Sequence, residues 1–278
     1  MQKSQAFEIQ PQVGANFKVL CINKILVNKI FTIFALVILN GNIYATILRN
    51  CQEHRRQLAV LIDPDKQSLS ETAAFAREIE ASSADYVFVG SSYMLGNLDR
   101  CIEAIKDNTQ KPVIIFPGHA SHISEKADAI LLLSLISGRN PEFLIGNHVI
   151  AAASLMQMDI EVISTGYVLV DGGRTTSVEY VSNTRPIPAD KPDLAVATAV
   201  AGEMLGLRMT YLEAGSGALN PVPDKMVAAV RRCTKSPLIV GGGLRNIESI
   251  NQKYEAGADI VVVGSAFEKK ELQINQFK

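Results

Sequence analysis

The sequence predicts one α/β domain, a modified TIM (β/α)8 barrel, and three observations lead to this prediction. Eight short apolar runs alternate with amphipathic helical segments between residues 57 and 263, which is the order that repeated βα units produce. The last three runs each end in a glycine-containing turn, where barrels of this type commonly hold a phosphate. Only residues 117–128 separate the third run from the fourth, so the outer helix there is expected to be missing or rearranged.

The predicted strands are nearly continuous in Val, Ile and Leu, which is typical of parallel strands buried on both faces. They are residues 58–62, 86–89, 113–116, 129–133, 161–170, 208–212, 237–240 and 259–263. A helix over residues 43–57 is expected to lead into the first strand. Capping signals predict further helices that open at Ser70 with Glu71, span residues 99–107, and run from Pro223 to Arg232.

The composition limits the classes of function. The chain has 278 residues, 47% of them hydrophobic and 20% charged, which is enough for a large core. Its 27 Lys and Arg against 28 Asp and Glu give a net charge of −1, which does not indicate nucleic acid as a partner. The four cysteines lie far apart without a CxxC pair, which argues against a zinc knuckle or a disulfide framework. Reduced thiols in a cytosol are the simplest interpretation.

Residues 1–41 differ from the rest of the chain and are predicted to be an atypical apolar extension before the barrel domain, residues 42–278. Lysines precede the apolar run 30–39, which is about half of the ~20 residues needed to cross a bilayer. A secretory signal or membrane anchor is one interpretation. The other is a start codon placed too far upstream, or an extension unusual for its family.

Glycine turns after the last three strands predict an anion site. They are Tyr-Leu-Glu-Ala-Gly-Ser-Gly at 211–217, three glycines at 241–243, and Gly264 with Ser265. Glycine permits positive φ and close approach of the backbone, and N–H groups beside a helix N-terminus favour a phosphate. Glu213 could accept a hydrogen bond from a hydroxyl of the same ligand. The predicted ligand is therefore a small phosphorylated polyol.

The ends of the first two strands suggest a cation site. Asp63 follows the first strand and Ser92 the second, and oxygen ligands at the carboxyl face of a barrel suit Mg²⁺. A turn cap is the alternative for Asp63, and Gly-Ser-Ser around Ser92 is a common turn. Lys66 either pairs with a second phosphate or is a solvated loop lysine. His119 and His122 have HxxH spacing, but no third ligand lies nearby in sequence, so they are interpreted as a loop pair.

A polar loop, residues 171–177, follows the fifth strand. It could act as a lid or a pyrophosphate clamp with Arg174 as its cation. It could equally be a solvated excursion of the chain.

Seven motifs in order carry a resemblance to a known family. They are Leu-Ile-Asp-Pro-Asp-Lys at 61–66, Gly-Ser-Ser at 90–92, Thr-Ser-Val at 176–178, Pro-Ile-Pro at 186–188, the string at 211–217, Gly-Gly-Gly-Leu at 241–244 and Val-Gly-Ser-Ala at 263–266. Over residues 42–268 the chain resembles the geranylgeranylglyceryl phosphate synthase family, including its bacterial polyprenylglyceryl phosphate synthases. The string at 211–217 is the most specific of the seven.

The resemblance implies a Mg²⁺-dependent prenyltransferase of phospholipid biosynthesis. Such an enzyme joins a long polyprenyl diphosphate to sn-glycerol 1-phosphate as an ether and releases diphosphate. The resemblance implies a metal near Asp63 and Ser92, and Lys66 and Arg174 are the candidate cations for the diphosphate. It implies glycerol phosphate contacts from Tyr211, Leu212, Glu213, Ala214, Gly215, Ser216, Gly217, Gly242, Gly243, Gly264 and Ser265. Leu61 departs from the pattern, because many relatives have a lysine there.

Two residues are predicted to carry the chemistry. Glu213 is expected to align the glycerol hydroxyl and accept its proton, and Tyr211 to orient the glycerol. A phosphosugar or indole-glycerol-phosphate type isomerase or lyase would use the same turns, with Asp63 and Glu213 as acid and base. A barrel that only binds phosphate or lipid is a third possibility. A long apolar groove would favour the prenyltransferase. We expect a cytoplasmic homo-oligomer with peripheral membrane contact.

Overall fold

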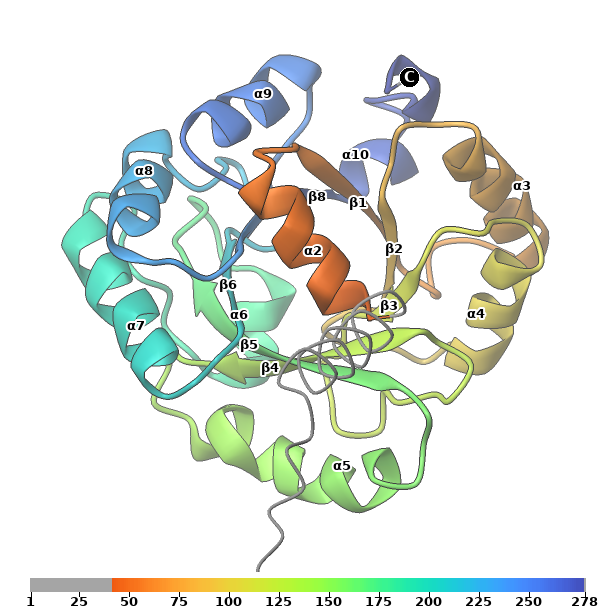
Figure 1. Ribbon diagram of the computed structural model, residues 1–278, viewed down its shortest axis with the longest axis horizontal. Helices are drawn as coiled ribbons and strands as arrows, with labels where there is room; N and C mark the ends of the chain where they lie inside the picture. Colours follow the sequence, from red (N-terminus) through yellow and green to blue (C-terminus); the bar gives the residue numbers. More distant parts are fainter. Residues whose placement is uncertain (1–41, 278) are drawn as a thin grey trace, which may run out of the picture. The chain divides into compact units, whose positions relative to one another are not determined.

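Eight parallel strands pair in chain order and close into a barrel, because β8 pairs back with β1 (Figure 1). The computed structural model describes residues 42–277. The strands are β1 (Gln57–Ile62), β2 (Tyr86–Val89), β3 (Val113–Ile115), β4 (Ala129–Leu135), β5 (Glu161–Leu169), β6 (Met209–Glu213), β7 (Leu238–Gly241) and β8 (Ile260–Val263). Each of the eight predicted strands is confirmed, with bounds that differ by at most two residues.

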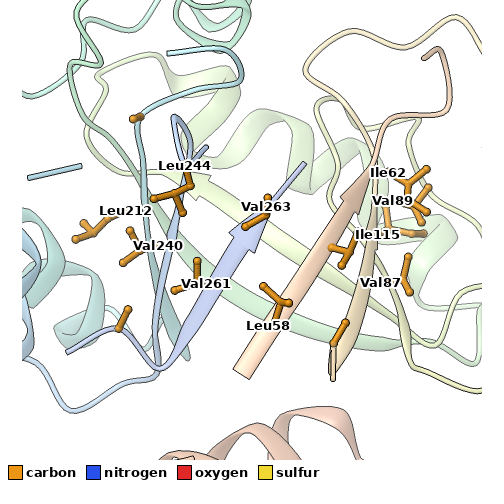
Figure 2. Packing of buried hydrophobic residues seen from close by; sticks show 14 of the residues in the cluster. Leu58, Ile62, Val87, Val89, Ile115, Leu212, Val240, Leu244, Val261 and Val263 are labelled. Carbon is orange, nitrogen blue, oxygen red and sulfur yellow. The ribbon is translucent and has the colours of Figure 1, made fainter. Parts of the chain in front are cut away.

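Side chains on the strands alternate between two cores. Those that point outward pack under the surrounding helices; Figure 2 labels several of them, among them Leu58, Ile62 and Val263. Those that point inward, such as Ala59, Phe88 and Tyr211, fill the barrel itself. Because every strand is buried on both faces, its sequence needs apolar residues at nearly every position.

Helices surround the barrel, with two exceptions. The surrounding helices are α3 (Leu69–Glu80), α4 (Leu98–Lys106), α5 (Asn147–Leu155), α6 (Ser177–Ser182), α7 (Pro192–Met204), α8 (Asp224–Cys233), α9 (Ile247–Glu255) and α10 (Ser265–Glu268). The π-helix η1 (Glu142–Gly146) precedes α5, and the 3₁₀-helix η2 (Ile274–Gln276) lies near the C-terminus. Between β3 and β4 there is a loop and no helix. The prediction of a missing outer helix there is confirmed.

The second exception is α2 (Ile43–Gln52), which crosses the N-terminal end of the barrel (Figure 1). Its first two N–H groups donate to the carboxylate of Glu161, at the start of β5. Its Tyr44 hydroxyl donates to the carbonyl of Arg208, directly before β6. Ile47 is buried in the interior core. The helix therefore closes this end of the barrel.

Two predicted helix boundaries were wrong. The first helix ends at Gln52 rather than at residue 57, because His54 adopts a left-handed φ of 53° and turns the chain into β1. The next helix is capped by Ser68 rather than opened at Ser70, because Ser68 forms a capping box with Glu71.

The predicted apolar extension, residues 1–41, lies outside the described residues. Among residues 42–277, the helices are all too short or too polar to cross a membrane.

Candidate active site

Glu213 lies at the centre of the candidate site. It is the last residue of β6, and alternation along the strand points both Tyr211 and Glu213 into the barrel. Both side chains are buried. The Gly215 N–H donates a hydrogen bond of 2.6 Å to Glu213 Oε1. The turn that follows β6 therefore holds the carboxylate in place.

Burial raises the pKa of Glu213 to about 7, because a carboxylate loses its hydration inside the barrel. The Gly215 N–H, which donates to Glu213, favours the charged form and offsets part of this effect. Glu213 thus titrates close to neutral pH, where a general base can both accept and release a proton. Burial and the Glu213 charge raise the pKa of Tyr211 well above its ordinary value, so Tyr211 remains a hydroxyl donor.

The pKa of Glu213 has a consequence for stability. Because the folded-state pKa of about 7 exceeds the ordinary value of 4.5, the folded state loses stability as the pH rises through 7. E213Q removes this penalty, which is on the order of 3 kcal/mol at pH 8. We expect calorimetry to show that the melting temperature of E213Q exceeds that of wild type by an amount that grows from pH 5 to pH 8. A pH-independent difference, or an equal effect of the exposed control E248Q, would contradict the assignment.

The glycine turns after β6 and β7 meet at Glu213. Gly242 has a φ of 84°, and a Cβ there would lie 2.3 Å from Glu213 Oε1 and 2.7 Å from the Gly215 nitrogen. Such close approach of one turn to another is possible only without a side chain. The turn after β8 reaches the same end of the barrel, and Gly264 packs against Leu61 at the end of β1. The structure thus brings the predicted turns together.

Two residues of the predicted glycerol phosphate contacts point elsewhere. The side chains of Leu212 and Ala214 are buried in the outer core under the helices. Any contact from these two residues to a ligand in the barrel would therefore come from their backbone. Ser216, by contrast, is exposed in the turn after β6.

Three aromatic rings pack together below the turns. The Tyr211 ring centroid lies 5.5 Å from that of Phe116 and 5.3 Å from that of Tyr167. The Tyr211 hydroxyl is buried and has no hydrogen-bond partner among residues 42–277. A buried hydroxyl without a partner is costly in a folded protein, and a ligand hydroxyl beside Glu213 would satisfy it. This agrees with the predicted role of Tyr211 in orienting a polyol.

An apolar groove begins at these rings. It is lined by Ser92, Phe116, Pro117, Gly118, His119, Ala120, Ile123, Ile130, Leu132, Leu133, Leu135, Phe143, Asn147, His148, Ala151, Leu155, Tyr167, Val178 and Val181. Its empty volume is about 760 Å³ with the open mouth included. The lining includes residues of the outer core, such as Ile130 and Ala151. The groove therefore leads out of the barrel on the side where no helix follows β3.

The predicted cation ligands stand at neighbouring strand ends. Asp63 follows β1 and Ser92 follows β2, and these strands pair up to Ile62 and Val89. A carboxylate and a hydroxyl are hard oxygen donors that fit Mg²⁺. Among residues 42–277 no group of three or more His, Cys, Asp or Glu side chains forms a metal cluster. A Mg²⁺ ion at Asp63 and Ser92 would therefore depend on phosphate oxygens of a ligand for most of its coordination.

The two predicted cations lie in different places. Lys66 is exposed in the loop after β1. Arg174 extends over the turn after β6, where a Cβ on Gly217 would lie 3.6 Å from its Nη2. Arg174 is thus beside the turn predicted to hold the glycerol phosphate. Its contact with a diphosphate stays a prediction, as does that of Lys66.

The His119 and His122 pair has local partners. His122 Nδ1 accepts from the Gly118 N–H, and His119 Nδ1 accepts from the Ser121 N–H. Each ring is therefore held within its own loop, as the loop-pair interpretation predicts. His119 also lines the groove, which the spacing of the histidines did not reveal.

Sequence reasoning missed the aromatic lining of the site. Tyr167 pairs with Tyr211 in the register of β5 and β6, and Phe116 follows β3 directly. An inward-facing aromatic residue near the carboxyl end of a strand is a signal that could have identified both. Asn147 and His148 lie on α5, and no pattern in the sequence connects α5 to the strand ends.

Comparisons with known proteins identify the family of this chain. A family model described as the PcrB family matches residues 50–278. The chain belongs to the PcrB family. This PcrB-family chain is 47% identical over 233 residues to the geranylgeranylglyceryl phosphate synthase of Chitinophaga pinensis, covering 84% of this chain and 92% of the relative. It is 44% identical to the protein of the same name from Pyrococcus furiosus, covering 78% and 86%.

A solved structure is similar to the barrel of this PcrB-family member. It is the (S)-3-O-geranylgeranylglyceryl phosphate synthase from Thermoplasma acidophilum in complex with its substrate sn-glycerol-1-phosphate. The TM-score is 0.79 and the sequence identity 35%, over 85% of this chain and 95% of that one. The resemblance predicted from the motifs is therefore confirmed.

Proposed function

We propose that this protein transfers a long polyprenyl group of geranylgeranyl type from its diphosphate to sn-glycerol 1-phosphate. The products are an ether-linked prenylglyceryl phosphate and diphosphate. One observation carries the proposal: the apolar groove meets the polar site at Phe116 and Tyr167, whose rings pack on Tyr211 beside Glu213. An apolar chain in the groove would bring its first carbon toward the glycerol site.

The groove also decides between the candidate functions. Its lining is mostly apolar, with Phe116, Ile130 and Leu133 among the residues that face the space, which suits a hydrocarbon chain. A phosphosugar isomerase or lyase would need the glycine turns but not this apolar space. The relatives from Chitinophaga pinensis and Pyrococcus furiosus carry the geranylgeranyl group in their name, and a group of this kind would suit the apolar groove.

The residues of the chain divide the chemistry among them. The turns after β6 and β7, at Gly217, Gly242 and Gly243, offer backbone N–H groups to the phosphate of the glycerol substrate. Tyr211 donates to a glycerol oxygen, and Glu213 accepts the proton of the attacking hydroxyl as the C–O bond forms. The bond from the allylic carbon to the diphosphate oxygen breaks, and diphosphate leaves with that electron pair.

A Mg²⁺ ion is part of the proposal. Asp63 and Ser92 would hold it at the diphosphate end of the groove, which Ser92 lines. When bound, Mg²⁺ neutralises the charge that develops on the leaving diphosphate. Lys66 and Arg174 are the proposed cations beside it. Leu61 has no positive charge to offer the diphosphate. The metal would therefore neutralise a larger part of the diphosphate charge than it would beside a lysine at this position.

The test uses the purified full-length protein with radiolabelled sn-glycerol 1-phosphate, Mg²⁺ and polyprenyl diphosphates of several lengths. The proposal predicts that label passes into the organic phase and that EDTA abolishes this transfer. A folded protein that binds sn-glycerol 1-phosphate but transfers no prenyl group of any length would refute it. Isomerase or lyase chemistry on a phosphorylated sugar would then be the next function to assay.

The far part of the groove should limit the length of the prenyl chain. Ala151 of α5 is buried and lines the groove, so A151W would fill space that the chain tail occupies. We expect kcat/KM for geranylgeranyl diphosphate to fall about 10- to 100-fold and the preferred diphosphate to become shorter. Assays with diphosphates of different lengths measure this. The control is A153W, an exposed position on the same helix; equal profiles for both variants would contradict the assignment of the groove.

Location and assembly complete the proposal. We propose a cytoplasmic homo-oligomer that contacts the membrane peripherally through the apolar run 30–39, because its lipid substrate and product reside there. Flotation of the full chain and of a chain starting at Asn42 with lipid vesicles tests the contact. Equal binding by both chains would remove residues 1–41 from the proposal, and light scattering measures the oligomeric state.

A further inference from the structure

Asp65 links the loops that follow β1 and β2. Its carboxylate accepts two backbone hydrogen bonds from the second loop, 2.8 Å from the Leu95 N–H to Oδ2 and 2.5 Å from the Gly96 N–H to Oδ1. Its own N–H donates to Asp63 Oδ1 over 3.0 Å. One residue therefore bonds both to the proposed metal ligand Asp63 and to the loop that carries the other ligand, Ser92.

The link depends on close contact at Gly96. A Cβ on this glycine would lie 2.5 Å from Asp65 Oδ1 and 3.3 Å from the Pro64 carbonyl oxygen. Any other residue at position 96 would therefore displace the Asp65 carboxylate from the Gly96 N–H or shift the loop. The glycine thus permits an approach that the two hydrogen bonds then fix.

The loop after β2 has few other restraints. Among residues 42–277, no other side chain from outside the loop donates or accepts a hydrogen bond with residues 91–96. From the opposite side, Gly118 packs against Ser91 and Ser92, where a Cβ would lie 2.2 Å from the Ser91 carbonyl oxygen. The loop that carries Ser92 is therefore held by the Asp65 carboxylate at residues 95 and 96 and by the backbone of Gly118 at residues 91 and 92.

The contacts of Asp65 assign its carboxylate to holding the loop after β2. Both of its carboxylate oxygens already accept backbone N–H bonds. The N–H of Asp65 occupies Oδ1 of Asp63, which orients that carboxylate. Residues that hold the ligands of a metal in this way commonly change its affinity by 10- to 100-fold when they are replaced.

We propose that Asp65 is a positioning residue that sets the separation of Asp63 and Ser92 and so the affinity of the site for Mg²⁺ with diphosphate. This inference rests on the proposed function of that site. The inference extends that function, because it assigns control of the metal affinity to a residue that touches neither the metal nor a substrate. The glycerol phosphate turns follow β6, β7 and β8, so their affinity should not depend on Asp65.

Two variants test the proposal. D65N keeps the size of the side chain but places an NH2 group against one of the two backbone N–H donors. G96A keeps the Asp65 charge but places a methyl group 2.5 Å from Asp65 Oδ1, which disturbs the bonds from the carboxylate to the loop. The control is D99N, an exposed aspartate in the first turn of α4. Melting temperatures confirm that each variant is folded.

The first measurement does not require activity. Electron paramagnetic resonance follows the binding of Mn²⁺, in place of Mg²⁺, with inorganic diphosphate. We expect the Mn²⁺ affinity to fall about 10-fold in both D65N and G96A, while calorimetry gives wild-type affinity for sn-glycerol 1-phosphate. In the transfer assay, the Mg²⁺ concentration for half-maximal rate should rise by the same factor, and D99N should match wild type.

Two results of the Mn²⁺ measurement would overturn the proposal. Loss of Mn²⁺ binding in D65N but not in G96A would make Asp65 a direct ligand. Wild-type Mn²⁺ affinity in both variants, or an equal loss of glycerol phosphate affinity, would show that the link does not position the metal site. If the wild-type protein transfers no prenyl group, the proposed function fails, while the Mn²⁺ measurement still decides the role of Asp65.

Discussion

Replacement of Glu213 by glutamine should lower kcat on the order of 10³-fold, within the usual range for loss of a general base. Glutamine retains an oxygen that accepts the Gly215 N–H, so the turn after β6 should keep its shape. The affinity for sn-glycerol 1-phosphate should therefore stay within a few-fold of wild type. Single-turnover assays give the chemical step, and calorimetry gives the affinity.

The same variant should change the pH profile. The base acts in its ionised form, and burial sets its pKa at about 7, so kcat/KM of the wild type should fall as the pH drops below 7. The substrate phosphate titrates near pH 6 and affects wild type and variant alike. The kcat/KM of E213Q should therefore no longer change around pH 7 but should still change near pH 6. The exposed control E248Q should keep both. E213Q within three-fold of wild-type kcat would remove Glu213 from the mechanism.

The second large effect is expected at Gly242. In G242A the new Cβ would lie 2.3 Å from Glu213 Oε1 and 2.7 Å from the Gly215 nitrogen, so the turns after β6 and β7 must separate. Their N–H groups could then no longer converge on one phosphate. We expect the affinity for sn-glycerol 1-phosphate to fall at least about 100-fold, the equivalent of two charge-assisted hydrogen bonds. Titration calorimetry with this ligand measures the loss.

A matched control separates crowding from backbone strain. Gly206 has a φ of 85°, close to the 84° of Gly242, but a Cβ there meets nothing within 4 Å. G206A and G242A therefore carry a similar cost for a left-handed alanine, roughly 1 kcal/mol or more. Only G242A should lose the ligand. Equal affinities in the two variants would show that the phosphate does not bind at this turn.

The sequence was sufficient for the barrel because burial on both faces leaves a strong local signal. Runs such as Ile260–Val263 can hardly be anything but interior strands. The helix boundaries were less certain, because Ser68 and Ser70 are both plausible caps and only the bond to Glu71 distinguishes them. The glycine turns were predictable because their conformations restrict the residue type.

The groove could not be predicted in the same way. It combines Phe116 and Tyr167 from strand ends with Ala151 from α5, and these positions are related only by the closure of the barrel. The short spacer after β3 indicated that an outer helix was absent, but not what would line the space. The Asp65 link was hidden for a similar reason, because it joins residues about 30 positions apart through backbone N–H groups.

The helix α2 has a consequence for how the chain folds. It is the first described element, yet its Ile43 and Tyr44 bond to residues 118 and 164 positions later in the chain. These partners become available only when β5 and the start of β6 are in place. Contacts so distant in sequence form late, because the chain loses entropy when a long loop closes and the stabilising bonds form only afterwards. Although α2 precedes every strand in the chain, it should therefore be among the last elements to dock, and its docking would complete the assembly of the barrel.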